Sequence, residues 1–144
     1  MLDVKDRELS PEVVTQLVRA MIAVARVDGL KDEERALIEA FHRDSTGAAL
    51  PSGWLSVDFD KPAAIAALSA VPDVAVQSCL LAAYADGAMS AGELSLVREL
   101  ATALGVGETA FTQAHDAVRD ALLAQLSQLP DSASVARVAG DLFR

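Results

Sequence analysis

The sequence predicts an all-α protein: a compact bundle of about seven helices built on two pseudo-symmetric helical hairpins. Hydrophobic residues make up 52% of the chain and aromatic residues only 4%, with alanine abundant, which favours packed helices over strands. An apolar, helix-like run ending in an Asp-Gly turn also occurs twice, at Asp28-Gly29 and Asp86-Gly87. Because 144 residues can enclose one core, we expect a single domain over residues 1–144.

The repeat extends beyond the two turns. Asp28 and Asp86 lie 58 residues apart, and at this offset the apolar positions before the turns coincide. The first turn is one residue shorter, and with this allowance Glu34 aligns with Glu93. The other aligned pairs are Val18 with Val76, Met21 with Cys79, Ile22 with Leu80, Ala25 with Ala83, Leu30 with Met89, Leu37 with Leu96, Ile38 with Val97 and Phe41 with Leu100.

The first hairpin begins at Ser10-Pro11-Glu12, where an N-cap serine, a first-turn proline and an early acid predict a helix start. Apolar residues then recur at helical spacing up to the Asp28-Gly29 turn. A second helix begins near Asp32, where acidic side chains favour the positive end of the helix dipole, and stops near Asp44.

Residues 45–62 interrupt the pattern with glycine and proline but carry Trp54 and Phe59, which predicts an ordered connector packed on the core. We expect a short helix over residues 61–70 and a longer one reaching Tyr84.

The second hairpin closes at Ser90-Ala91-Gly92-Glu93, which has the spacing of a capping box. Gly105 is a natural C-terminal stop for that helix. A long helix is predicted over residues 108–129, ended by Pro130, and a last helix over residues 132–143.

The net charge of −9 argues against binding to nucleic acid, where lysine and arginine supply most of the affinity, and against an anionic membrane surface. No apolar stretch approaches the length of about 18 residues that a membrane span needs, so no direct membrane insertion is expected. The N-terminus lacks the pattern of a signal peptide, which predicts a cytoplasmic protein. The single cysteine, Cys79, aligns with Met21 and is expected in the core.

Motifs of the common enzyme classes are missing: there is no Gly-x-Ser-x-Gly, phosphate-binding Gly-Lys-Ser/Thr loop, His-Glu-x-x-His or Cys-x-x-Cys. We therefore expect a protein without catalytic residues. His42, in the last turn of its helix, and His115, beside Asp116, are weak ligand candidates. Trp54 is expected to anchor the connector, with ligand or partner recognition as the alternative.

Carboxylates gather at both turns. Asp28 and Glu34 lie at the first turn, and Asp86 and Glu93 hold the equivalent places at the second. Oxygen ligands of this kind suit Ca²⁺, Mg²⁺ or Mn²⁺. The alternative is structural: each aspartate accepts hydrogen bonds from backbone N–H groups that open the next helix, while the glycine takes a positive φ, and the capping box already accounts for Glu93.

The apolar helix, the Asp-Gly turn, the short spacer to a glutamate and the second copy from Glu93 to Leu104-Gly105 resemble the TerB-like, tellurite-resistance-associated domain. The resemblance covers residues 13–123 and leaves a C-terminal helical extension at 124–144. It implies an all-helical fold with internal pseudo-twofold symmetry and a divalent-metal site at Asp28, Glu34, Asp86 and Glu93.

By the same resemblance, the expected function is a non-catalytic sensor or adaptor in a bacterial stress response, binding a protein partner. The alternative is a protein-interaction module whose acidic turns are purely structural, binding through the helices after residue 108 or the Trp54 connector. The oligomeric state is left open.

Overall fold

Every regular element in the described part of the chain is helical. The structure, a computed structural model, describes residues 9–56, 58–85 and 89–126, and no strand occurs in these ranges. The elements are α1 (Pro11–Ala25), the 3₁₀ helix η2 (Arg26–Asp28), α2 (Asp32–Thr46), the 3₁₀ helix η3 (Ser52–Ser56), α3 (Lys61–Leu68), α4 (Pro72–Ala83), α5 (Ala91–Ala103) and α6 (Glu108–Leu126). The all-α prediction is confirmed for these residues.

Local side chains set the helix starts. The Ser10 hydroxyl accepts a hydrogen bond from the Val13 N–H at 3.2 Å, and the Asp60 carboxylate accepts one from the Ala63 N–H at 3.2 Å. Both bonds satisfy N–H groups that lack a partner within their own helix. Gly47 and Gly105 follow α2 and α5 with φ of 76° and 79°, the left-handed conformation that ends helices.

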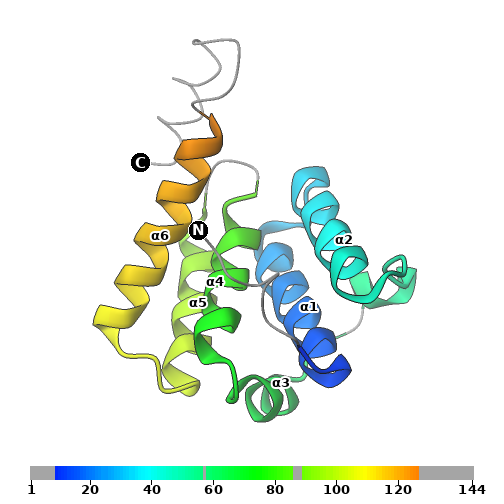
Figure 1. The fold of residues 1–144 in the computed structure, drawn as a ribbon, viewed down its shortest axis with the longest axis horizontal. Coiled ribbons are helices and arrows are strands. Elements are labelled where there is room, and N and C mark those ends of the chain that lie inside the picture. The colour runs from blue at the N-terminus through cyan, green and yellow to red at the C-terminus, as the bar shows by residue number, and fades with distance from the viewer. Residues whose placement is uncertain (1–8, 57, 86–88, 127–144) are drawn as a thin grey trace.

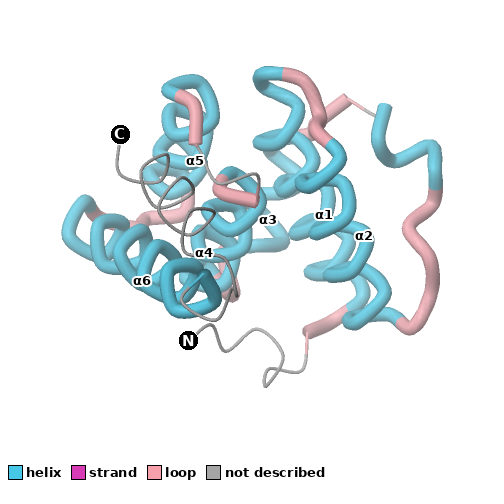
Figure 2. The backbone as a smooth tube through the Cα atoms, turned by 90° about the horizontal axis from the view of Figure 1, so that it is seen from above, coloured by secondary structure: helices cyan, strands magenta, loops and turns pink. Residues whose placement is uncertain are grey.

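Two helices occupy the centre of the molecule. Figure 1 and Figure 2 show α1 and α4 in the middle, with α2 on one side and α6 on the other. The most extensive packing is between α1 and α4; α1 also packs on α2 and α3, and α4 on α5 and α6. The two predicted hairpins, α1 with α2 and α4 with α5, therefore meet through their first helices.

The core forms around these central helices. Leu17, Val24 and Leu80 belong to a large cluster that extends to α5 and α6. Met21 and Ile38 belong to a second cluster between α1 and α2, and Trp54 of the connector packs against it. The expectation that the connector places its tryptophan against the core is met.

Several predicted boundaries differ from the structure. The first helix was expected to run to Asp28, but its last turn is the separate 3₁₀ helix η2, in which the Gly29 N–H donates to the Arg26 carbonyl at 3.1 Å. The third helix ends at Leu68 rather than at residue 70, because Pro72 begins α4 and the residue before a proline avoids the helical conformation. The predicted helix over 132–143 and most of the expected extension at 124–144 lie outside the described residues.

None of the described helices combines the length and the apolar character needed to cross a membrane.

Candidate functional site

Most aligned positions of the two hairpins have the same burial; Phe41, which is partly buried where Leu100 is buried, is an exception. Before the turns, all four aligned pairs are buried: Val18 and Val76, Met21 and Cys79, Ile22 and Leu80, and Ala25 and Ala83. After the turns, Ile38 and Val97 are both fully buried, and the candidate ligands Glu34 and Glu93 are each 1% exposed. The two glutamates therefore occupy equally buried positions in the first turns of α2 and α5.

Each buried glutamate closes the start of the helix that follows its turn. The Glu34 Oε1 atom accepts a hydrogen bond from the Lys31 N–H at 3.0 Å, and the Glu93 Oε1 atom accepts one from the Ser90 N–H at 2.9 Å. Ser90 completes the predicted capping box, because its hydroxyl accepts the Glu93 N–H at 3.0 Å. One oxygen of each candidate ligand is thus already used in holding a helix start.

Asp28 lies differently from the glutamates. Its side chain is exposed, and Gly29 has the expected positive φ, 91°. The structural alternative expected Asp28 to accept backbone N–H groups at the start of α2, but the described residues include no such bond to Asp28. The carboxylate lies instead beside the start of α5, where its Oδ1 would be 3.8 Å from a β-carbon placed on Gly92.

This position has an electrostatic consequence. Asp28 follows the C-terminal end of α1, where a negative charge is unfavourable, but it also lies near the N-terminal end of α5, where a negative charge is favourable. The tertiary contact with the other hairpin thus offsets a local penalty. Asp28, which the sequence predicts to stabilise its own turn, instead lies at the contact between the two hairpins.

The fourth candidate ligand, Asp86, lies outside the described residues, together with Gly87 and Ala88. Within the described ranges, no three or more histidine, cysteine, aspartate or glutamate side chains gather closely enough to hold a metal ion. A set that includes Asp86 is not covered by that statement, so binding of Ca²⁺, Mg²⁺ or Mn²⁺ at Asp28, Glu34, Asp86 and Glu93 stays a prediction.

His42 takes part in a cluster that the sequence did not predict. The residue is 5% exposed, and Nδ1 lies 3.0 Å from the Ala48 carbonyl oxygen, which can only accept. Nδ1 therefore carries a proton. The ring meets Trp54 edge-on, with centroids 5.4 Å apart, and the Arg19 guanidinium carbon lies 5.3 Å from the centroid of the Trp54 ring. The only sequence signal was a tryptophan in an interrupted connector, since Arg19 and His42 are far from it in the chain.

His115 takes part in a second polar contact, this time between α4 and α6. The Tyr84 hydroxyl oxygen lies 2.7 Å from His115 Nε2, and His115 Nδ1 lies 3.4 Å from the Asp116 carboxylate. Burial raises the pKa of the Tyr84 hydroxyl; the Arg119 charge opposes this shift and the Asp116 charge adds to it. The phenol therefore stays protonated through the neutral pH range. Tyr84 comes just before the second acidic turn, so this bond holds the end of α4 against α6.

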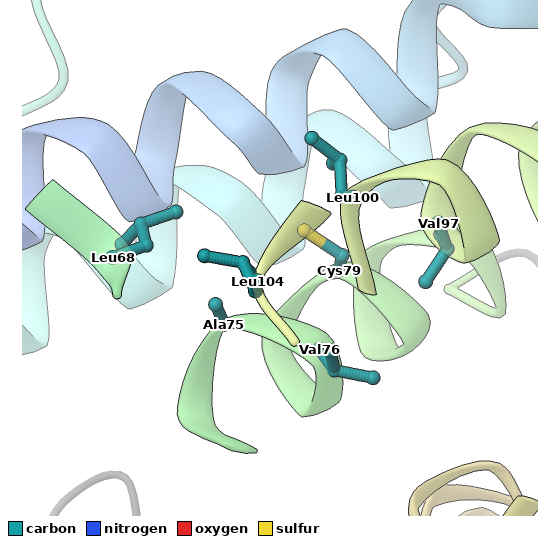
Figure 3. A pocket seen from close by; sticks show the side chains of 7 residues that line it. All are labelled: Leu68, Ala75, Val76, Cys79, Val97, Leu100 and Leu104. Carbon is teal, nitrogen blue, oxygen red and sulfur yellow. The ribbon is translucent and has the colours of Figure 1, made fainter. Parts of the chain in front are cut away.

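A small apolar pocket lies between α3, α4 and α5 (Figure 3). Cys79 of α4 lines it together with Leu68 of α3 and Val97 and Leu100 of α5. Burial raises the pKa of the Cys79 thiol to about 12, so the sulfur is protonated and unreactive at neutral pH. The predicted place of Cys79 in the core is confirmed, and the lining of this pocket offers no pair of groups for acid–base chemistry.

Comparisons with models of protein families, with curated proteins and with solved structures returned no significant match to this chain.

Proposed function

We propose that this protein is a non-catalytic, protein-binding adaptor with a TerB-like pairing of two helical hairpins, whose acidic turns hold the hairpins in place. The observation that carries the proposal is the equivalent use of Glu34 and Glu93. Each is 1% exposed and accepts the N–H that opens the following helix. A carboxylate buried in such a bond stabilises a turn without any ion.

The contact between the hairpins supports the same role. Val27 and Asp28 of the first turn pack against Gly92 at the start of α5. The first turn thus forms part of the contact between the two hairpins. The outer helices α2 and α6 lie on opposite sides of the molecule (Figure 1). We place the adaptor in the cytoplasm, in a bacterial stress response, on the resemblance of its turns to the TerB-like domain.

A second candidate function is divalent-cation sensing at the same turns. It is favoured by Asp28, whose carboxylate is exposed and has no hydrogen bond or ion pair within the described residues. With Asp86 contributed by the other turn, such carboxylates would supply hard oxygen ligands for Ca²⁺, Mg²⁺ or Mn²⁺. In this version the bound ion changes how the hairpins meet and so controls the surface that a partner contacts.

Isothermal titration calorimetry separates the two functions. Ca²⁺, Mg²⁺, Mn²⁺ and Zn²⁺ are titrated into the wild-type protein and into Asp28→Asn plus Asp86→Asn, and thermal melts are recorded for both. The adaptor proposal expects no binding at millimolar ion and a lower melting temperature for the variant. Saturable binding that the variant loses supports the sensor, and an unchanged melting temperature contradicts a structural role for the aspartates.

Glu93→Gln provides a matched control. Glutamine can still accept the Ser90 N–H, because either residue type serves in a capping box, but it is neutral and a much weaker ligand for a hard cation. The adaptor proposal expects a melting temperature close to that of the wild type. If Glu93 is a metal ligand, we expect Glu93→Gln to remain folded and to lose affinity for the ion.

A further inference from the structure

The cluster of Arg19, His42 and Trp54 joins three separate elements, α1, α2 and η3. Arg19 stacks over one face of the indole, and His42 contacts the ring edge-on at an interplanar angle of 84°. The His42 imidazole is in turn held by its bond to the Ala48 carbonyl. The indole therefore lies between a cation and a buried, hydrogen-bonded ring.

Arg19 differs from the other arginine that stacks on an aromatic ring in the described chain. The Arg98 guanidinium carbon lies 4.8 Å from the Phe111 ring centroid, and the Arg98 side chain forms an ion pair with Glu108. Arg19 is partly buried, and within residues 9–56, 58–85 and 89–126 it has no carboxylate at ion-pair distance. Its Nε atom is shielded from solvent and has no acceptor among these residues.

The shielded Nε–H of Arg19 is a charged donor without an acceptor among the described residues. Removing a charged donor from water without supplying an acceptor is unfavourable, and charge-assisted bonds to a carboxylate or phosphate are among the strongest that arginine forms. The chain has 21 acidic residues against 12 lysine and arginine residues, so a nearby carboxylate would be easy to supply. The missing partner is therefore informative.

We propose that the Arg19–Trp54 cluster is a binding site for an oxyanion, the carboxylate or phosphate group of a small ligand. The guanidinium supplies the charge and N–H donors for charge-assisted bonds, and the indole under it orients it. The net charge of −9 repels a polyanion such as nucleic acid. The ligand that we propose therefore carries a single anionic group. The site is separate from the acidic turns and does not depend on the proposed function.

Trp54 makes the test direct, because it is the only tryptophan of the chain and its emission reports on this cluster alone. Sodium phosphate and sodium acetate are titrated separately at pH 7, with sodium chloride adjusted to keep the ionic strength constant. We expect a saturable change in emission, and the arm that saturates at the lower concentration identifies phosphate or carboxylate as the preferred group.

Matched variants make the test specific. Arg19→Gln is expected to weaken binding at least tenfold, whereas Arg98→Gln, which removes the paired arginine on Phe111, retains it. Circular dichroism verifies that both fold, and Arg19→Lys replaces Arg19→Gln if the latter does not. A response that fails to saturate in both arms, or equal binding by the wild type and the Arg19 variant, overturns the proposal.

Discussion

A β-carbon placed on Gly92 would lie 2.7 Å from the Cγ1 atom of Val27. Val27 lies in the 3₁₀ helix that follows α1, in the first copy of the repeat, and Gly92 lies in the first turn of α5, in the second copy. A side chain on residue 92 would therefore require Val27, which is 41% exposed, to shift. Glycine at this position is explained by a contact with a residue 65 positions earlier in the chain.

The first prediction concerns that contact. Gly92→Ala is expected to lower the free energy of unfolding by about 1–3 kcal/mol through overpacking, although alanine is otherwise the better helix former. Urea denaturation measures the loss. In a Val27→Ala background the clash is absent, so the same change should become neutral or stabilising. Gly53→Ala, where nothing lies within 4 Å of the added carbon, is the control. If Gly92→Ala changes the free energy of unfolding equally in the wild type and in the Val27→Ala variant, residue 92 does not contact Val27.

The second prediction concerns the capping box. Ser90→Ala removes the acceptor of the Glu93 N–H and should cost about 1 kcal/mol of stability. Ser95 is exposed in the middle of α5, so Ser95→Ala should be neutral or slightly stabilising. Thermal melts of the two variants provide the comparison. If both variants lose the same stability, the serine hydroxyl has no capping role.

The third prediction concerns the bond between α4 and α6. Tyr84→Phe removes the hydroxyl that lies 2.7 Å from His115 Nε2 and is expected to cost about 0.5–1.5 kcal/mol. In a His115→Ala background the partner is already missing, so the same substitution should cost much less. A double-mutant cycle from denaturation curves gives the coupling energy. A value near zero means that the hydroxyl and the imidazole do not interact in solution.

The fourth prediction concerns alkaline pH. Burial raises the pKa of Cys79 from 9.0 to about 12, so between these values the unfolded chain releases a proton that the folded protein keeps. Stability contributed by the neutral thiol is complete below pH 9 and is lost as the pH rises toward 12. The stability difference between the wild type and Cys79→Ala should therefore shrink over this range. A constant difference in melts from pH 8 to 11 contradicts the buried thiol.

Local chemistry made much of the fold predictable. Ser10 and Ser90 mark helix starts, Gly47 and Gly105 follow helix ends, and the apolar spacing on each side of the turns identifies the buried faces. These signals can be read from the chain because a cap or an amphipathic face depends on residues within a few positions. The same locality makes the capping role of Glu93 predictable from its spacing to Ser90.

The sequence by itself determined the helical character of the described residues, the repeated Asp-Gly motif and the capping roles at α1 and α5. Only the tertiary structure decided that Asp28 lies against the other copy, that Gly92 lies against Val27, and that Arg19, His42 and Trp54 meet. Each of these is a contact between elements far apart in sequence. Their geometry depends on how α1 and α4 pack, and no spacing within a single helix contains that information.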